Sequence, residues 1–167
     1  MGLVHGCVLG LDVSTAITGL CLLDLDGQVL CLSHVDLTRC VGIWAKADTV
    51  RERLVTLHVD APVGHVFVEE ALQAFRPGFS NASTLSTLVR FNGIVSYIAR
   101  QVTGCDPVPL SAATARKDCG ITVRRSPALG NAKEQVFRHV STVVMPDHVC
   151  TWTRTGKVQS CHRDEAD

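Results

Sequence analysis

The chain has 167 residues, 46% of them hydrophobic, and its 16 Lys and Arg balance its 16 Asp and Glu. This length and apolar content suit one domain with its own core. The zero net charge excludes polyanion binding through bulk charge, so any basic surface must be local. No pair of the eight cysteines has Cys-x-x-Cys spacing, which excludes the common redox and zinc-finger motifs.

The start of the chain and its composition indicate where the protein resides. The N-terminus enters an apolar strand without the basic segment and separate apolar core of a signal peptide. We therefore expect a soluble intracellular protein that binds no membrane. A bacterial-type cytoplasm or a mitochondrial or plastid compartment would fit, and secretion would not.

The first half of the chain predicts three antiparallel strands, a helix and a fourth strand. Apolar runs at 7–11, 18–23 and 29–32 are separated by short polar turns, as in a β-meander. From Ile43 to Val59 the apolar residues recur at helical spacing. The break at 60–62 then leads into a strand at 66–68, which stops at Glu69.

The second half predicts alternating helices and a strand. A long helix from about Ser83 to Val102 precedes a short strand at 106–110 and a helix from Ala112 to about Cys119. A basic connection at 122–127 leads to a helix from Asn131 to Val144, with Asn131 as its N-cap. We therefore predict an α/β fold over residues 1–167 as one domain. Its mixed five-stranded sheet has three antiparallel strands, then parallel strands, and is flanked by helices.

Four acidic residues are candidate metal ligands. Asp12 ends the first strand and Glu69 ends the fourth, so both side chains emerge at one edge if these strands are neighbours. Asp164 and Asp167 have the i, i+3 spacing of one helix face. Four convergent carboxylates repel one another unless cations lie among them, and hard divalent cations prefer oxygen ligands. Taken singly, each acid is better explained as a solvated surface residue, and only their joint arrangement favours a metal site.

Five segments form a recognisable pattern along the chain. They are the end of the first strand at 9–15 with Thr18-Gly19, the end of the fourth strand at 67–70, the helix at 88–95 with Gly93, the stretch at 131–136 and the closing Asp-x-x-Asp at 164–167. In this order and spacing they resemble the motifs of the RuvC-like Holliday junction resolvases, and the resemblance covers nearly the whole chain. This chain departs from the family pattern at Val13, where Pro is usual, and at Leu72, where bacterial members carry an aromatic residue. It also ends at Asp167, so we expect the final helix to be truncated.

The resemblance implies a ribonuclease-H-like fold and a DNA endonuclease that cuts four-way junctions. Asp12, Glu69, Asp164 and Asp167 would hold two Mg²⁺ ions, with Mn²⁺ as a possible substitute, and Lys133 would lie near them. One ion would activate water while the other stabilises the leaving 3′ oxygen. The helix from Ser83 to Val102 would form a homodimer. We expect Ser14 to serve the turn after Asp12.

Basic and aromatic residues are candidates for binding branched DNA. Basic side chains in loops and helix starts would neutralise phosphates, and a phenylalanine would stack on a base; the candidates are Phe75, Arg76, Arg116, Lys117, Arg124, Arg125 and Lys133. The alternative is scattered solvated charge.

Two other functions stay open. One is an actin-like or sugar-kinase-like ATP-binding domain, because the segment at 10–27 also resembles the phosphate-binding hairpin of those proteins. The other is a non-catalytic scaffold or RNA-binding subunit of a ribonucleoprotein.

Overall fold

The computed structural model describes residues 6–71, 82–126 and 129–145. The chain divides into two compact units, Met1–Leu110 and Ser111–Asp167. Among the described residues, no helix is both long and apolar enough to cross a membrane. Four predicted site residues lie outside the described part: Phe75, Arg76, Asp164 and Asp167.

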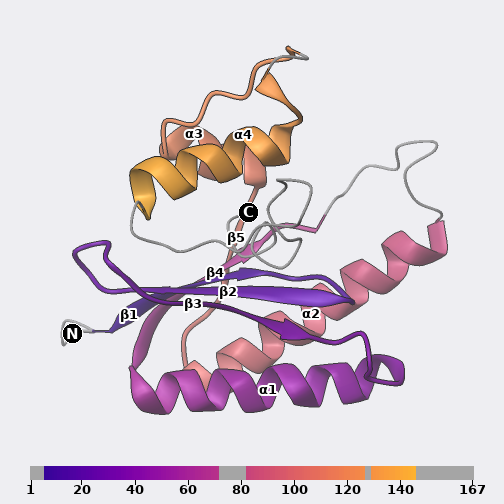
Figure 1. The fold of residues 1–167 in the computed structure, drawn as a ribbon. Coiled ribbons are helices and arrows are strands. Elements are labelled where there is room, and N and C mark those ends of the chain that lie inside the picture. Colours follow the sequence, from indigo (N-terminus) through magenta and orange to yellow (C-terminus); the bar gives the residue numbers. More distant parts are fainter. Residues whose placement is uncertain (1–5, 72–81, 127–128, 146–167) are drawn as a thin grey trace. The chain divides into compact units, whose positions relative to one another are not determined.

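The first unit contains a five-stranded mixed sheet with the order β3-β2-β1-β4-β5 (Figure 1). The first three strands pair antiparallel, whereas β4 is parallel to both β1 and β5. This arrangement confirms the predicted sheet and makes the predicted first and fourth strands neighbours. The strands are β1 (Cys7–Asp12), β2 (Ile17–Leu23), β3 (Val29–Asp36), β4 (Val63–Glu69) and β5 (Val108–Leu110).

Two strands are longer than the apolar runs predicted, because pairing continues through polar positions. β3 remains paired with β2 as far as Asp36, and β4 is already paired with β1 at Val63, where the register shifts by one residue before it continues. The fifth strand is shorter than predicted and begins at Val108.

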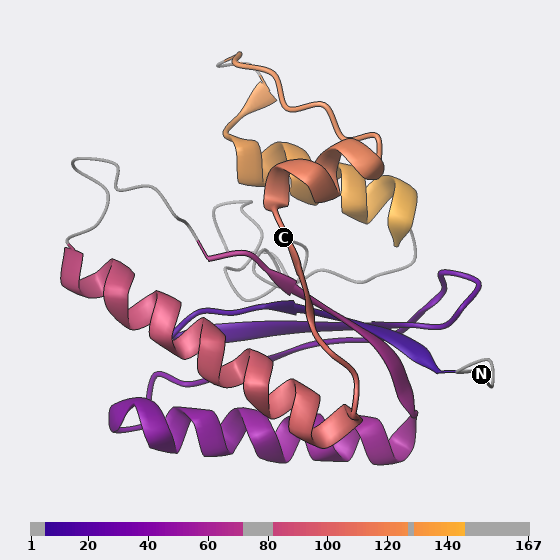
Figure 2. The same cartoon turned by 180° about the vertical axis from the view of Figure 1, so that it is seen from behind.

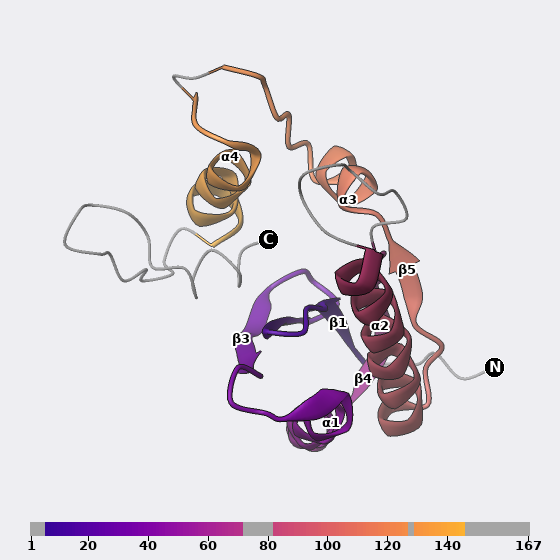
Figure 3. The same ribbon diagram turned by 90° about the vertical axis from the view of Figure 1, so that its right-hand side faces the viewer.

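Both helices of the first unit pack on the same face of the sheet (Figures 2 and 3). They are α1 (Gly42–Asp60) and α2 (Ala82–Thr103), within a residue or so of their predicted bounds. α1 turns Ala47, Val50, Leu54 and Leu57 toward the core, at the spacing of one helix face. In α2, the buried positions include Phe91 and Val95, which are both fully inaccessible to solvent.

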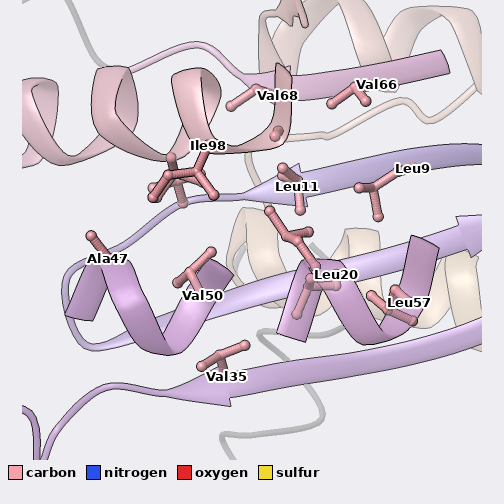
Figure 4. Close-up of a cluster of buried hydrophobic side chains, with 14 of the residues drawn as sticks. Leu9, Leu11, Leu20, Val35, Ala47, Val50, Leu57, Val66, Val68 and Ile98 are labelled. Carbon is pink, nitrogen blue, oxygen red and sulfur yellow. The ribbon is translucent and has the colours of Figure 1, made fainter. Parts of the chain in front are cut away.

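The core lies between this helical layer and one face of the sheet (Figure 4). Leu9 and Leu11 of β1 and Val66 and Val68 of β4 are all buried there. Side chains of a strand alternate between the two faces. The residues that follow Leu11 and Val68 therefore point to the face opposite the helices, which is where the candidate site is built.

The second unit, in the part of it that the structure describes, is mainly helical. It contains α3 (Ala112–Asp118), α4 (Ala132–His139) and the π-helix η2 (Val140–Val144). Asn131 caps α4 as predicted, through a capping box in which its side chain accepts from the backbone N–H of Glu134 and the Glu134 side chain accepts from the backbone N–H of Asn131.

The helix predicted to run from Asn131 to Val144 changes character after His139. The hydroxyls of Ser141 and Thr142 both donate to the Arg138 carbonyl, at 3.2 Å and 2.7 Å. Such side-chain bonds compete with the helical ladder, and the segment 140–144 is rich in β-branched residues. The last turn is accordingly a π-helix rather than a continuation of α4.

Candidate metal centre and nucleic-acid interface

Asp12 and Glu69 occupy equivalent places on adjacent parallel strands. Leu11 pairs with Val68 in the β1–β4 register, and each acid is the next residue and the last of its strand. Neighbouring strands lie about 4.8 Å apart, so one further step along the register brings the two residues beside each other. Both are half-buried and lie on the face opposite the helices. The structure thus brings together two of the four predicted ligands.

The strand geometry also distinguishes Glu69 from its neighbour Glu70. The Glu70 N–H still donates to the Leu110 carbonyl at 2.9 Å, so the backbone remains strand-like there. Because side chains alternate, Glu70 points to the other face from Asp12 and Glu69. Glu70 is also exposed, whereas Glu69 is half-buried. Of the adjacent acids, Glu69 is the one that can meet Asp12.

The turn after Asp12 is held by its own residues. The Ser14 hydroxyl accepts from the backbone N–H groups of Ala16 and Ile17, each at 3.2 Å, which confirms the predicted turn role of Ser14. The Thr18 hydroxyl, which is fully buried, donates to the Ser14 carbonyl at 3.1 Å. The backbone around Ser14 therefore has little freedom to move Asp12.

Two contacts from elsewhere in the unit hold the same turn. The Lys46 ammonium, on α1, donates to the Thr15 carbonyl at 2.5 Å, and the Leu37 N–H donates to the Ala16 carbonyl at 2.8 Å. Both donors come from segments distant in sequence. The end of β1 is thereby attached to α1 and to the residue that follows β3.

The end of β4 is attached in a similar way. The Asn92 side-chain amide, on α2, donates to the Glu69 carbonyl at 2.9 Å. Sequence reasoning identified neither Asn92 nor Lys46 as a site residue. No local pattern indicates them, because each contact joins residues more than twenty positions apart along the chain.

Asp36 lies at the same edge of the sheet, but its carboxylate is hydrogen-bonded within the loop that follows β3. Its carboxylate accepts from the Thr38 hydroxyl at 2.6 Å and from the Thr38 N–H at 2.8 Å. These two bonds, with smaller contributions from Arg39 and His34, hold the pKa of Asp36 below its ordinary value. Asp36 therefore serves as a loop cap, and we do not count it among the candidate metal ligands.

The two carboxylates fit a divalent cation in chemistry and number. They are hard oxygen donors on neighbouring strands, and partial exposure leaves them accessible to a hydrated ion. Within residues 6–71, 82–126 and 129–145, no cluster of three or more His, Cys, Asp and Glu is present. The described residues thus include two of the candidate ligands, and the other two, Asp164 and Asp167, lie outside the described part of the chain.

Most of the predicted phosphate-binding residues belong to the second unit. Across residues 111–126 and 129–145 there are six Lys and Arg against two Asp and Glu, so this part is basic although the whole chain is neutral. Lys117, Arg124, Arg125 and Lys133 are exposed, and Arg116 is half-buried. That Lys133 lies near the acids stays a prediction.

Gln135 fixes the basic loop that precedes α4. Its side-chain amide accepts from the Arg124 N–H at 2.9 Å and donates to the Arg124 carbonyl at 2.8 Å and the Gly130 carbonyl at 3.0 Å. This two-way contact resembles one rung of a β-ladder. It holds the backbone of Arg124 against α4 while the side chains of Arg124 and Arg125 stay exposed.

The chain was compared with known families, curated proteins and solved structures. No family model and no curated protein matches it. Among solved structures, Thermus thermophilus RuvC in complex with a Holliday junction substrate matches with a TM-score of 0.64 at 17% identity, over 97% of this chain and 88% of that chain. A second Thermus thermophilus RuvC structure matches with a TM-score of 0.60, also at 17% identity, over 96% and 89% of the two chains.

This chain has the fold of RuvC. The match confirms the ribonuclease-H-like architecture implied by the sequence motifs. Identity of 17% establishes common architecture rather than common chemistry. Any activity of this chain must therefore come from its own residues, among which Asp12 and Glu69 lie at the end of adjacent strands of the sheet.

Proposed function

We propose that this chain is a metal-dependent, structure-selective endonuclease that cleaves four-way DNA junctions by phosphodiester hydrolysis. One observation carries the proposal: two carboxylates, Asp12 and Glu69, end adjacent parallel strands on the same face of a RuvC-like sheet. A structural neighbour with the same fold is a RuvC bound to a Holliday junction substrate. The substrate that we assign is accordingly branched DNA.

The proposed metal ligands are Asp12, Glu69, Asp164 and Asp167, which would hold two Mg²⁺ or Mn²⁺ ions. Bound metal supplies activation of water and stabilisation of the leaving 3′ oxygen. The protein's contribution is to fix the backbone at Asp12 and Glu69 before substrate arrives, through the bonds that hold the ends of β1 and β4. Lys133 adds positive charge near the scissile phosphate.

The proposed DNA-binding surface consists of basic residues and one aromatic. Phosphate contacts hold DNA in register without reading its sequence, which suits an enzyme that selects a shape. The basic character of the described second unit and the exposure of its arginines support this role. Phe75 would stack on an unpaired base, and the phosphate ligands are Arg76, Arg116, Lys117, Arg124, Arg125 and Lys133.

A homodimer is the expected assembly, since resolving a junction requires two symmetric cuts. α2 offers a surface for it: Val89 and Tyr97 are 48% and 59% exposed, and Gly93 between them has no neighbour in its side-chain space. These positions are spaced by four and lie on one helix face. The double variant Val89→Glu, Tyr97→Glu should be monomeric by analytical ultracentrifugation. A dimer of undiminished stability in this variant would refute the interface.

The test is cleavage of a synthetic four-way junction by the full chain with and without Mg²⁺. Asp12→Asn and Glu69→Gln should each reduce the rate by more than about a hundredfold while junction binding persists, because losing a ligand exceeds the 10–100-fold effects of altering residues around ligands. Glu70→Gln is the matched control and should remain active, since Glu70 points to the opposite face. Wild-type activity in Glu69→Gln would retire the assignment.

The same preparation separates the alternative functions. Junction or RNA binding without metal-dependent cleavage would assign a non-catalytic subunit of a ribonucleoprotein. ATP binding without nuclease activity would assign the kinase-like domain.

A further inference from the structure

At the end of β4, the side chain of Asn92 on α2 donates a hydrogen bond to the backbone carbonyl of Glu69. We infer that Asn92 is a positioning residue, which fixes the backbone of Glu69 so that its carboxylate meets the metal ion shared with Asp12. The inference rests on the proposed function, because it assumes that Glu69 is a metal ligand. It assigns Asn92 a role in metal binding although its side chain contacts the backbone of Glu69 rather than its carboxylate.

The contact locks one particular peptide unit. The carbonyl of Glu69 accepts from the Asn92 amide at 2.9 Å, and the N–H of the same peptide, which belongs to Glu70, donates to the Leu110 carbonyl at 2.9 Å. Both polar groups of this peptide are therefore satisfied, one by α2 and the other by β5. Since a peptide is planar, fixing its two ends fixes the ψ angle of Glu69.

The position of this peptide explains why a side chain is needed there. In a trans peptide the C=O and N–H point in opposite directions, so the Glu69 carbonyl points away from β5. The partner strand on that side is β1, which ends at Asp12 and turns away. A backbone carbonyl without a partner is costly when it is shielded from water. Asn92 provides the bond at the point where β1 stops.

The chemical identity of residue 92 suits this task. A carbonyl only accepts, so its partner must be a donor, and the amide nitrogen of Asn supplies one on a short side chain. The helix that carries it is well anchored: the adjacent Phe91 and, one turn on, Val95 are fully buried. The donor is thus held by the core and not by a flexible loop.

A purely structural role would predict a different outcome from a positioning role. If Asn92 only joins α2 to the sheet, its removal lowers the stability of the fold and leaves metal affinity unchanged in the folded protein. If it positions Glu69, metal affinity falls in protein that is still fully folded. Residues that orient metal ligands typically change affinity by about 10–100-fold when altered.

The experiment measures binding of Mn²⁺ alone to the full chain, from the electron paramagnetic resonance signal of the free ion. Asn92→Ala should weaken the affinity by about tenfold, and so should Asn92→Leu, which keeps the side-chain volume without a donor. Ser96→Ala is the matched control: Ser96 is half-buried on α2, one turn from Asn92, and its hydroxyl donates to the Asn92 carbonyl at 2.8 Å. It should bind Mn²⁺ like wild type.

A second measurement needs neither metal nor activity. Hydrogen exchange of the Glu70 amide should be faster in both Asn92 variants than in wild type or Ser96→Ala, because the peptide has lost one of its two anchors. Unchanged exchange at Glu70, or wild-type Mn²⁺ affinity in both variants, would overturn the inference. Failure of the proposed function looks different: Asp12→Asn would then bind Mn²⁺ as tightly as wild type.

Discussion

The attachment of the Asp12 turn to α1 leads to a quantitative prediction for Lys46→Met. Methionine keeps the length of the side chain but removes the donor to the Thr15 carbonyl. A hydrogen bond that involves a charged group contributes roughly 1.5–3 kcal/mol. Lys46 is half-buried, so we take the lower end, about 1.5 kcal/mol. For a chain of this size, 1 kcal/mol corresponds to about 2–4 °C in the melting temperature, which gives a loss of about 3–6 °C.

Calorimetric melting of Lys46→Met, Lys46→Arg and Thr56→Ala tests this prediction. Lys46→Arg keeps a donor and should recover most of the loss. Thr56→Ala is the control on the same helix, since the Thr56 hydroxyl bonds only to its own helix, at the Glu52 carbonyl. The loss in Lys46→Met should persist at high salt, because the acceptor is a neutral carbonyl. If Lys46→Met melts with the wild type, the turn is not held as we describe.

Three further predictions concern other parts of the molecule. The bonds from Thr38 lower the pKa of Asp36 below 3.8, so the ionised carboxylate stabilises the fold above about pH 4 and this contribution is lost as pH falls through the native pKa. In urea titrations the difference in unfolding free energy between wild type and Asp36→Asn should therefore shrink below about pH 4. A difference that stays constant with pH would contradict this. Iodoacetamide at about pH 8 should modify exposed Cys119 well before Cys21, because burial and the nearby Cys31 raise the pKa of the Cys21 thiol to about 11. Equal modification rates at the two cysteines would refute this prediction. Gln135→Ala removes the bonds that hold the backbone of Arg124. It should weaken junction binding several-fold in fluorescence anisotropy and leave Mn²⁺ affinity unchanged. Junction binding like that of wild type would count against a role of the Arg124 loop in binding DNA.

The features that the sequence predicted well have local signals. Apolar runs and short polar turns identify the three-stranded meander, and the residue types at Ser14 and Asn131 indicate a turn and a helix cap. Asp12 and Glu69 stand out because each follows an apolar run, and the fold then needs only to make β1 and β4 neighbours.

The features that the sequence did not predict depend on contacts between distant segments. Lys46 reaches Thr15 across 31 positions and Asn92 reaches Glu69 across 23, so no window of sequence contains either pair. The distinction between Glu69 and its neighbour Glu70 likewise depends on the register of β4 against β1, which no local pattern contains. The end of α4 was mispredicted because the Ser141 and Thr142 hydroxyls compete for the carbonyl of Arg138.

The central claim is that Asp12 and Glu69 bind one divalent ion together. Anomalous diffraction from a crystal of the full chain grown with Mn²⁺ would test it most directly. The account predicts an anomalous peak bonded to a carboxylate oxygen of both residues. A peak that contacts neither residue, or separate peaks with no ion in common, would contradict it.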